Sequence, residues 1–184
     1  MAANDGRHRF GPDSSKLMLR TYRSGLAAQA GHDLTIEVTQ WSADLDGDDR
    51  APSRLAARID MASLIVRAGT GGVKPLSDRD RREIAATARK QLDTGRYPEA
   101  TFTAERFEPD GNGGGVIDGT LTLHGQPRPL RLQVSRAGEG GYRVSGTVVQ
   151  TQFGIKPYSG MFGALKLRDA VDVEIDVGPP AAGP

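Results

Sequence analysis

The stretch Leu34-Thr-Ile-Glu-Val-Thr-Gln-Trp-Ser-Ala-Asp-Leu45 decides the fold class of this chain. Leu34, Ile36 and Val38 alternate with polar residues, which is the period of a strand with one buried face. From Trp41 onward the apolar residues occupy odd positions instead of even ones. Because one extra residue swaps the two faces of a strand, this change predicts a bulge or a sharp bend within one long strand. Long strands that bend in this way are typical of a closing β-barrel.

Alternation of the same kind predicts further strands along the chain. They cover 17–19, 55–61 with 64–66 as an extension, 101–107, 116–123, 130–134, 142–148 and 171–177. The glycine-rich stretches 110–115 and 137–141 lie between such runs and tolerate positive φ, so they predict hairpin turns. The short connections favour antiparallel pairing between strands that follow one another in the chain.

One segment breaks this rhythm and predicts an α-helix from Ser77 to Leu92. Ile84, Ala88 and Leu92 lie four positions apart and would share one face of that helix. Ser77 is a suitable N-cap, and Gly95 can end the helix. The expected fold is therefore all-β: an eight-stranded antiparallel barrel with one helix between strands three and four.

Length and composition favour one domain. We expect a flexible N-terminal segment (1–13), a barrel domain (14–177) and a flexible C-terminal tail (178–184). The absence of cysteine excludes disulfides and thiol chemistry, and a formal net charge of +1 gives no basic surface for nucleic acid. No apolar run approaches the ~18 residues of a membrane span. The first residues lack the apolar run of a secretory signal, so a cytoplasmic location is expected for this sequence.

Three motifs follow one another in the second half of the chain. Lys90-Gln-Leu-Asp-Thr-Gly-Arg-Tyr-Pro-Glu-Ala-Thr-Phe102 places a Tyr-Pro turn between a helix end and the Thr-Phe start of a strand. Gly119-Thr-Leu-Thr-Leu-His-Gly-Gln-Pro-Arg-Pro-Leu130 is a hairpin that ends in Arg-Pro, and Phe153-Gly-Ile155 precedes the last strand. In this order the motifs resemble the YceI-like family, and the similarity runs from about Lys16 to Val177.

The resemblance implies a lipocalin-like barrel whose interior holds an elongated amphiphilic molecule. Polyisoprenoids, isoprenoid quinones and fatty-acid derivatives are the ligand types associated with the family, and binding, carrying or sequestering them is not catalysis. Many members are exported to the periplasm, and related barrels suggest a homodimer. No cofactor or metal is expected. This chain departs from the family at Gln150-Thr-Gln152, where many members carry an Arg and an Asp.

The expected ligand contacts combine inward-facing strand residues with residues of the motifs and of an apolar loop. The loop 154–165 is rich in glycine and apolar side chains, which either plug the end of the barrel or line a ligand entrance. Gly119, Gly146 and Ala57 either leave space for the ligand or mark bends in the strands. The polar members of the set, together with Lys156 and Gln152, would orient a headgroup. The set comprises His32, Leu34, Ile36, Val38, Phe102, Leu121, Leu132, Val148, Gln150, Phe153, Ile155, Tyr158, Met161, Phe162, Val173 and Ile175.

Two other functions stay open on the residues alone. A barrel with a filled core and no physiological ligand would act in stress or in protein interactions. A hydrolase-type enzyme would use His32, next to Asp33, as a general base. Adjacent strand residues point to opposite faces, however, so this pair is not expected to form a catalytic dyad. The three histidines lack metal-ligand spacing, and the glycine clusters 69–72 and 111–115 lack the context of a phosphate-binding loop.

Overall fold

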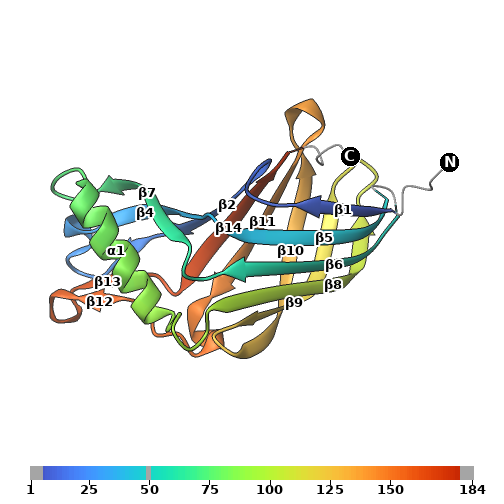
Figure 1. Ribbon diagram of the computed structural model, residues 1–184. Coiled ribbons are helices and arrows are strands. Elements are labelled where there is room, and N and C mark those ends of the chain that lie inside the picture. Colours follow the sequence, from blue (N-terminus) through green and yellow to red (C-terminus); the bar gives the residue numbers. More distant parts are fainter. Residues whose placement is uncertain (1–5, 49–50, 179–184) are drawn as a thin grey trace.

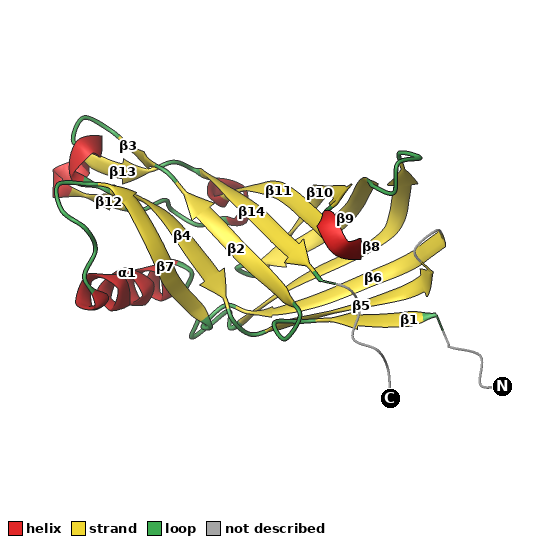
Figure 2. Cartoon of the chain, turned by 90° about the horizontal axis from the view of Figure 1, so that it is seen from above, coloured by secondary structure: helices red, strands yellow, loops and turns green. Residues whose placement is uncertain are grey.

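The computed structural model describes residues 6–48 and 51–178. Within these residues, eleven strands form one antiparallel sheet in the order β1-β5-β6-β8-β9-β10-β11-β14-β2-β4-β7. The sheet curls around a long interior (Figures 1 and 2). Its strands are β1 (Arg7–Phe10), β2 (Ser15–Thr21), β4 (His32–Val38), β5 (Trp41–Asp48), β6 (Ala51–Asp60), β7 (Leu64–Gly71), β8 (Glu99–Pro109), β9 (Gly115–Leu123), β10 (Gln126–Arg136), β11 (Tyr142–Val149) and β14 (Ala170–Val177).

A smaller sheet lies at one end of the molecule, near the start of β4 and the end of β7 (Figure 2). It has the order β12-β13-β3 and is built from β12 (Ser159–Gly160), β13 (Leu165–Leu167) and β3 (Arg23–Ser24). The sequence segment between β11 and β14, expected as a loop, therefore contains two short strands.

Four strands form one two-stranded antiparallel ribbon that bends in its middle: β4 continues into β5 on one side, and β6 continues into β7 on the other. The chain passes from β4 to β5 through Thr39 and Gln40, while β4 pairs with β7 and β5 pairs with β6. At the bend the Thr39 N–H donates to the Ser63 carbonyl at 3.1 Å. The Asp60 N–H donates to the Gln40 carbonyl at 3.0 Å. Because β4 also pairs with β2 and β6 also pairs with β8, the ribbon connects the two halves of the curled sheet.

The all-β, barrel-like class is confirmed, but among the described residues the main sheet has eleven strands where eight were expected. The change of parity within 34–45 is a break between two strands, because Thr39 and Gln40 bond across the bend and leave the regular ladder. The expected strand 55–66 is divided in the same way between β6 and β7. A further difference is β1, which pairs with β5 although 7–10 belongs to the segment expected to be flexible. Of the expected C-terminal tail, 179–184 lies outside the described residues.

The predicted helix is present as α1 (Asp78–Gln91). Ser77 caps it: the Ser77 hydroxyl accepts a hydrogen bond from the Asp80 N–H at 3.1 Å, and the Asp80 carboxylate accepts one from the Ser77 N–H at 2.9 Å. Gly95 does not end the helix, because the residue that adopts the left-handed conformation after α1 is Asp93 (φ +47°). Aspartate tolerates this conformation better than most residues. The helix packs along β7 and covers one side of the sheet (Figure 2).

The buried apolar residues form two clusters, which lie on different walls of the curled sheet. One cluster, on β8 to β11 and the segment after β11, contains Met61, Ala100, Phe102, Ala104, Leu121, Leu123, Leu132, Val148, Phe153 and Ile155. The other, on β2, β4, β5, β7 and α1, contains Leu17, Leu34, Ile36, Val38, Trp41, Leu64, Val66 and Ala85. The inward-facing residues therefore do not merge into a single filled core.

Candidate ligand-binding cavity

A cavity of about 1250 Å³ lies between the two clusters. Ligand pockets typically measure about 300–1,000 Å³, so this space exceeds what a drug-sized molecule needs. The glycine turn 111–115 borders one end of the cavity, and His32, Tyr158 and Leu165 border the other. The cavity is therefore elongated and follows the length of the curled sheet.

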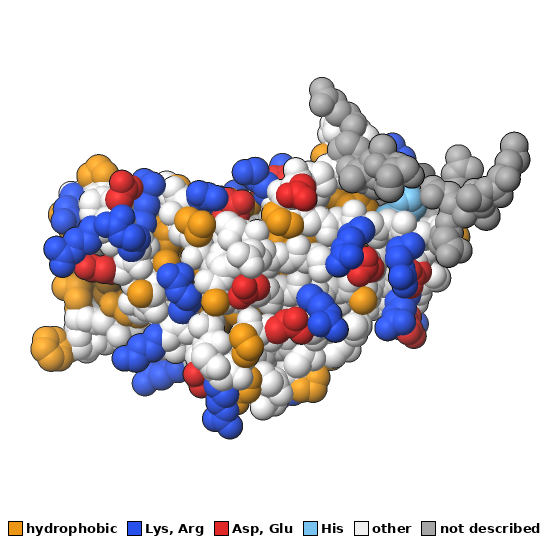
Figure 3. Space-filling model, in the orientation of Figure 1, with side chains coloured by type: hydrophobic (Ala, Val, Ile, Leu, Met, Phe, Trp, Pro, Cys, Tyr) orange, Lys and Arg blue, Asp and Glu red, His pale blue; other side chains and the backbone are white. Residues whose placement is uncertain are grey.

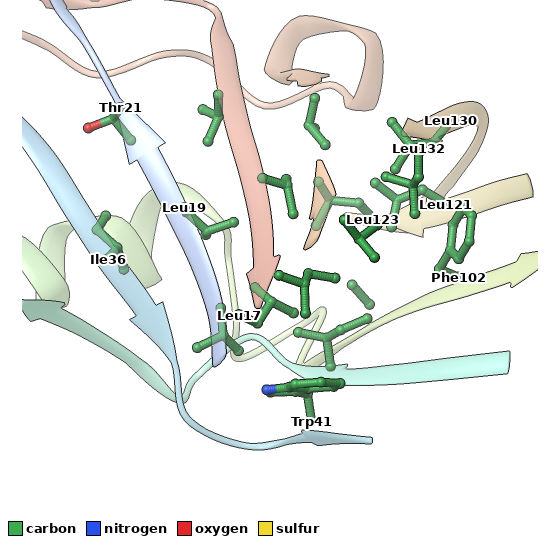
Figure 4. A pocket seen from close by; sticks show the side chains of 18 of the residues that line it. Leu17, Leu19, Thr21, Ile36, Trp41, Phe102, Leu121, Leu123, Leu130 and Leu132 are labelled. Atoms are coloured by element: carbon green, nitrogen blue, oxygen red, sulfur yellow. The ribbon is translucent and has the colours of Figure 1, made fainter. Parts of the chain in front are cut away.

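Alternation along each strand builds the walls. On β2, Leu17, Leu19 and Thr21 follow one another along the inner face (Figure 4). Figure 4 also shows Phe102 of β8 and Leu132 of β10 on the wall across from them. Because successive side chains of a strand point to opposite faces, the apolar members of each alternating run meet in the interior. The helix contributes Ile84, Ala88 and Leu92 to one side of the cavity.

Polar groups border the cavity at both ends: Glu108 and Arg136 lie beside the glycine turn 111–115, and a larger group lies at the end near α1. His32 and Lys74 lie there, together with Asp80, Glu83 and Gln91 of the helix and its N-terminal flank. The middle of the cavity, in contrast, is lined by aliphatic and aromatic side chains. An amphiphilic ligand would match this division, with its chain in the apolar part and its polar group at the border.

Two buried polar atoms in the cavity wall have no hydrogen-bond partner among the described residues. They are the Thr21 hydroxyl and the Trp41 indole Nε1, and both side chains are about nine-tenths buried. A buried donor without a partner is unfavourable, and most such groups in proteins are paired. A ligand with a hydrogen-bond acceptor would satisfy either group.

His32 and Asp33 do not form a catalytic pair. The His32 Nε2 lies 2.8 Å from the Lys74 carbonyl, whereas the Asp33 carboxylate accepts a hydrogen bond from the Arg23 N–H at 2.8 Å. Each member of the pair is thus engaged by a different partner. His124 Nδ1 lies 3.1 Å from the Phe153 carbonyl, so this histidine is held within the turn that follows β9. Among the described residues, no group of three His, Asp or Glu is placed to hold a metal ion.

Thirteen of the sixteen predicted contact residues line the cavity. Phe153 is buried in the wall behind the cavity surface, where it is 2% exposed. Met161 and Phe162 of the β12–β13 hairpin are exposed and do not line the cavity, and their predicted ligand contact stays a prediction. Whether the other residues contact a ligand stays a prediction. The thirteen are His32, Leu34, Ile36, Val38, Phe102, Leu121, Leu132, Val148, Gln150, Ile155, Tyr158, Val173 and Ile175.

Several cavity residues were missed by the sequence prediction. Leu17 and Leu19 carried the signal, because they alternate in the same way as the residues that were chosen. Trp41 was not chosen because it has the opposite parity to Leu34 along the chain. The bend between β4 and β5 brings both side chains to the inner face. The helix residues had a helical period, but a period does not show which element they face. The missed set includes Leu17, Leu19, Trp41, Leu64, Leu76, Ile84, Leu92, Leu123 and Leu130.

The small strand residues do not simply leave space. A Cβ at Gly119 would lie 2.4 Å from Cζ of Phe102, and a Cβ at Gly146 would lie 2.6 Å from Cδ2 of Leu132. Each glycine therefore gives room to a larger side chain on the neighbouring strand. Ala57, in contrast, lines the cavity itself.

Ion pairs on the outer face keep charge away from the interior. Arg131 of β10 donates to Asp118 of β9, from Nε to Oδ1 at 2.7 Å and from Nη2 to Oδ2 at 3.0 Å. These hydrogen bonds, with the charge of the guanidinium, hold the pKa of the Asp118 carboxyl below its ordinary value. Arg20 of β2 makes a similar pair with Glu174 of β14, with Nε 3.0 Å from Oε1. None of these four residues lines the cavity.

The fold and the cavity define a class of protein: a curled antiparallel β-sheet around an elongated apolar space, as in lipocalin-like binding proteins. Comparison with family models gives a match to the YceI-like domain over residues 12–178. The chain belongs to the family of YceI-like domains. Among the residues that the structure describes, no helix combines the length and the apolarity needed to cross a membrane.

Curated relatives are found among the UPF0312 proteins of Shewanella. The protein of Shewanella oneidensis is 37% identical over 93 residues, which cover 48% of this chain and 41% of that protein. The protein of Shewanella baltica is 36% identical over 110 residues, which cover 55% of this chain and 56% of that protein. The matched segment therefore spans about half the length of these relatives.

Two solved structures share the fold. BcnA of Burkholderia cenocepacia matches with a TM-score of 0.62 at 17% identity, over 91% of this chain and 98% of BcnA. A polyisoprenoid binding domain from Saccharophagus degradans matches with a TM-score of 0.55 at 15% identity, over 95% of this chain and 99% of that domain. At these identities the likeness concerns the fold alone.

Proposed function

We propose that this protein binds an elongated amphiphilic lipid inside the curled sheet and carries or sequesters it without a chemical reaction. A polyisoprenoid, an isoprenoid quinone or a fatty-acid derivative has the required shape. The observation that carries the proposal is the elongated apolar cavity of about 1250 Å³ with polar groups at its ends. The fold likeness to a polyisoprenoid binding domain supports the same ligand class.

The physical basis is the transfer of apolar surface out of water. Each buried CH₂ contributes roughly 0.8 kcal/mol, so a ten-carbon stretch contributes about 8 kcal/mol before ordering and desolvation costs are subtracted. The unpartnered Trp41 Nε1 and Thr21 hydroxyl add a preference for a ligand that carries a hydrogen-bond acceptor. Isoprenoid quinones and fatty-acid derivatives both carry carbonyl acceptors.

The two other functions receive less support. A filled core is not what the structure describes, because a cavity of about 1250 Å³ lies within the curled sheet. For a hydrolase, His32 would need an orienting carboxylate, and the neighbouring Asp33 instead accepts from the Arg23 N–H. No observation on the described residues favours a reaction over binding.

Mass spectrometry of the purified protein tests the proposal. Native spectra should show an added mass that disappears after organic extraction, and the extract should contain a long-chain lipid. The chain has a single tryptophan, and Trp41 lines the cavity, so its emission should change on titration with a long-chain quinone or fatty acid. A protein with no retained lipid and no response to either ligand would contradict the proposal.

A further inference from the structure

Four large apolar side chains are exposed at one end of the molecule. Leu26 is 101% exposed, Val73 86%, Met161 57% and Phe162 112%. They lie on three turns: the turn after β3, the turn after β7 and the β12–β13 hairpin, which Figures 1 and 2 place at the same end. We call these four residues the apolar tips. In Figure 3, apolar side chains gather at this end, with cationic side chains close to them.

The three turns are joined to one another and to the end of the cavity. The Ala27 N–H donates to the Ala164 carbonyl at 2.9 Å, which ties the turn of Leu26 to the hairpin. His32 Nε2 lies 2.8 Å from the Lys74 carbonyl and so holds the turn of Val73. His32 and Lys74 also border the cavity. The apolar tips therefore surround one end of the cavity as a fixed group.

The backbone of the hairpin is unfavourable for the residues it carries. Met161 and Phe162 adopt φ values of +50° and +54°, in the left-handed region that suits glycine and asparagine. A side chain in this conformation is normally compensated by packing or by function. Here packing offers little compensation, because Phe162 is fully exposed and more than half of Met161 is exposed. Folding alone does not explain two large apolar residues at this turn.

Cations accompany the apolar tips. Lys74 follows Val73, and Lys166 lies on β13 beside the hairpin. In the described part of the chain, Lys166 takes part in no ion pair. Three carboxylates nearby have partners: Asp33 has Arg23, Asp80 has Ser77 and the charge of Lys74, and Glu83 has Arg79. Asp78, in the first turn of α1, takes part in no ion pair among the described residues. The β12–β13 hairpin thus carries two of the apolar tips beside a lysine, Lys166, that has no ion pair.

We propose that the apolar tips dock on an anionic lipid bilayer, with their side chains at the boundary between headgroups and acyl chains. Apolar side chains flanked by lysine are suited to this boundary, where the lysines meet anionic headgroups. The tips stand on three separate turns, which suits a deformable surface better than the flat, packed patch of a protein interface. Docking would hold the cavity end against the membrane. The inference rests on the proposed function for its purpose, but docking is measured without cargo.

Sedimentation with vesicles tests the proposal. Wild type is mixed with phosphatidylcholine vesicles that contain about 30% phosphatidylglycerol, and with vesicles of phosphatidylcholine alone. We expect binding to the anionic vesicles to be about tenfold tighter at low salt, and to weaken as salt is added. Wild type that stays in the supernatant with both vesicles would overturn the proposal, and would point to a protein partner for the tips.

One variant separates docking from structure. Met161→Asn/Phe162→Gly places residues that suit the left-handed backbone, so its melting temperature should equal or exceed that of wild type. Its affinity for anionic vesicles should nevertheless fall about tenfold, because two inserted side chains are lost. The control is Ile65→Thr, which removes an exposed apolar side chain on β7 and should bind as wild type does. A tip variant that binds vesicles as tightly as wild type would also overturn the proposal.

A cavity variant distinguishes this inference from the proposed function. Val148→Trp should lose cargo and still bind anionic vesicles as wild type does, since Val148 lies inside the cavity. If the protein binds vesicles but retains no lipid in any form, docking stands and the cargo proposal fails. If vesicle binding falls together with cargo binding in this variant, the docking surface is wrong.

Discussion

Leu132 of β10 lies over Gly146 of β11, so that a Cβ at position 146 would stand 2.6 Å from Cδ2 of the leucine. Leu132 is buried and lines the cavity. The glycine thus sets how far the leucine side chain can lie back against the sheet. The volume of the cavity depends on this contact.

Gly146→Ala should therefore push the Leu132 side chain into the cavity. Inserting a group into a packed site typically costs about 1–3 kcal/mol, and urea denaturation should show a loss of unfolding free energy in this range. In a Leu132→Ala background the same glycine change should cost much less, because the clashing atom is gone. Equal costs in the two backgrounds would show that the Arg131 carbonyl, 3.2 Å from the built Cβ, is the limiting contact instead.

Val148→Trp tests the interior directly. Val148 is 8% exposed and lines the cavity, whereas the next residue, Val149, does not line it. The larger ring should fill part of the cavity and abolish lipid binding while the circular dichroism spectrum stays that of a β protein. Val149→Trp is the matched control, with the same change one position along the strand, and it should retain lipid. Persistent binding in a folded Val148→Trp protein would remove this residue from the site.

Trp41→Phe tests the unpartnered indole. The change removes the Nε1 donor and keeps an aromatic ring, so the affinity for a ligand with a carbonyl group should fall. A hydrogen bond contributes about 0.5–1.5 kcal/mol, which corresponds to a loss of roughly twofold to twelvefold. Affinity for a hydrocarbon of the same chain length should change little. A ligand displacement assay with a nonpolar fluorescent probe measures both, and equal losses for the two ligands would exclude a hydrogen bond to Trp41.

The loop 154–165 divides into a buried part and an exposed part. Ile155 is 2% exposed and belongs to the core, so Ile155→Ala should lower the unfolding free energy by about 2–5 kcal/mol. Met161→Ser/Phe162→Ser should leave the melting temperature of the ligand-free protein nearly unchanged, because neither side chain is packed. Thermal melts of the two variants beside wild type make the comparison. A large fall for the double variant would show that these residues cover the core after all.

The Asp118–Arg131 pair predicts a pH-dependent contribution to stability. The pKa of Asp118 is lowered in the folded protein, first by its hydrogen bonds to Arg131. The pair therefore stabilises the fold at pH values above the ordinary aspartate pKa, and this contribution is lost as the pH falls through the lowered value. Asp118→Asn should be less stable than wild type at neutral pH, and the difference should shrink in acid. Urea midpoints measured across the acid range test this, and a constant difference would contradict it.

Strand alternation was enough to predict most of the inner face, because the period of two is local. The period of two did not predict that the chain breaks into two strands at Thr39 and Gln40. A change of parity is satisfied equally by a bulge and by a break, and only the pairing of β4 with β2 and of β6 with β8 selects the break. Pairing of this kind joins residues far apart in the chain, which local patterns do not contain.

The outward position of Met161 and Phe162 had no signal in composition either. Apolar residues in a loop normally cover a core, and the prediction followed that rule. Their direction depends on two consecutive positive φ values, which no sequence propensity favours for methionine or phenylalanine. Sites at which local preference and observed conformation disagree are expected to be functional ones.

The neighbouring positions of β2 and β14 have a consequence for the timing of synthesis. Arg20 and Glu174, 154 residues apart in the chain, face each other across the contact between these two strands. A chain that is still being translated lacks β14 until all the other described strands have been made, because β14 is the last of them in the sequence. Its wall is then open along the whole edge of β2, and the inner apolar faces are exposed to water. Cargo can be enclosed only after β14 has paired with β2, and a nascent chain is at its greatest risk of aggregation just before that strand docks.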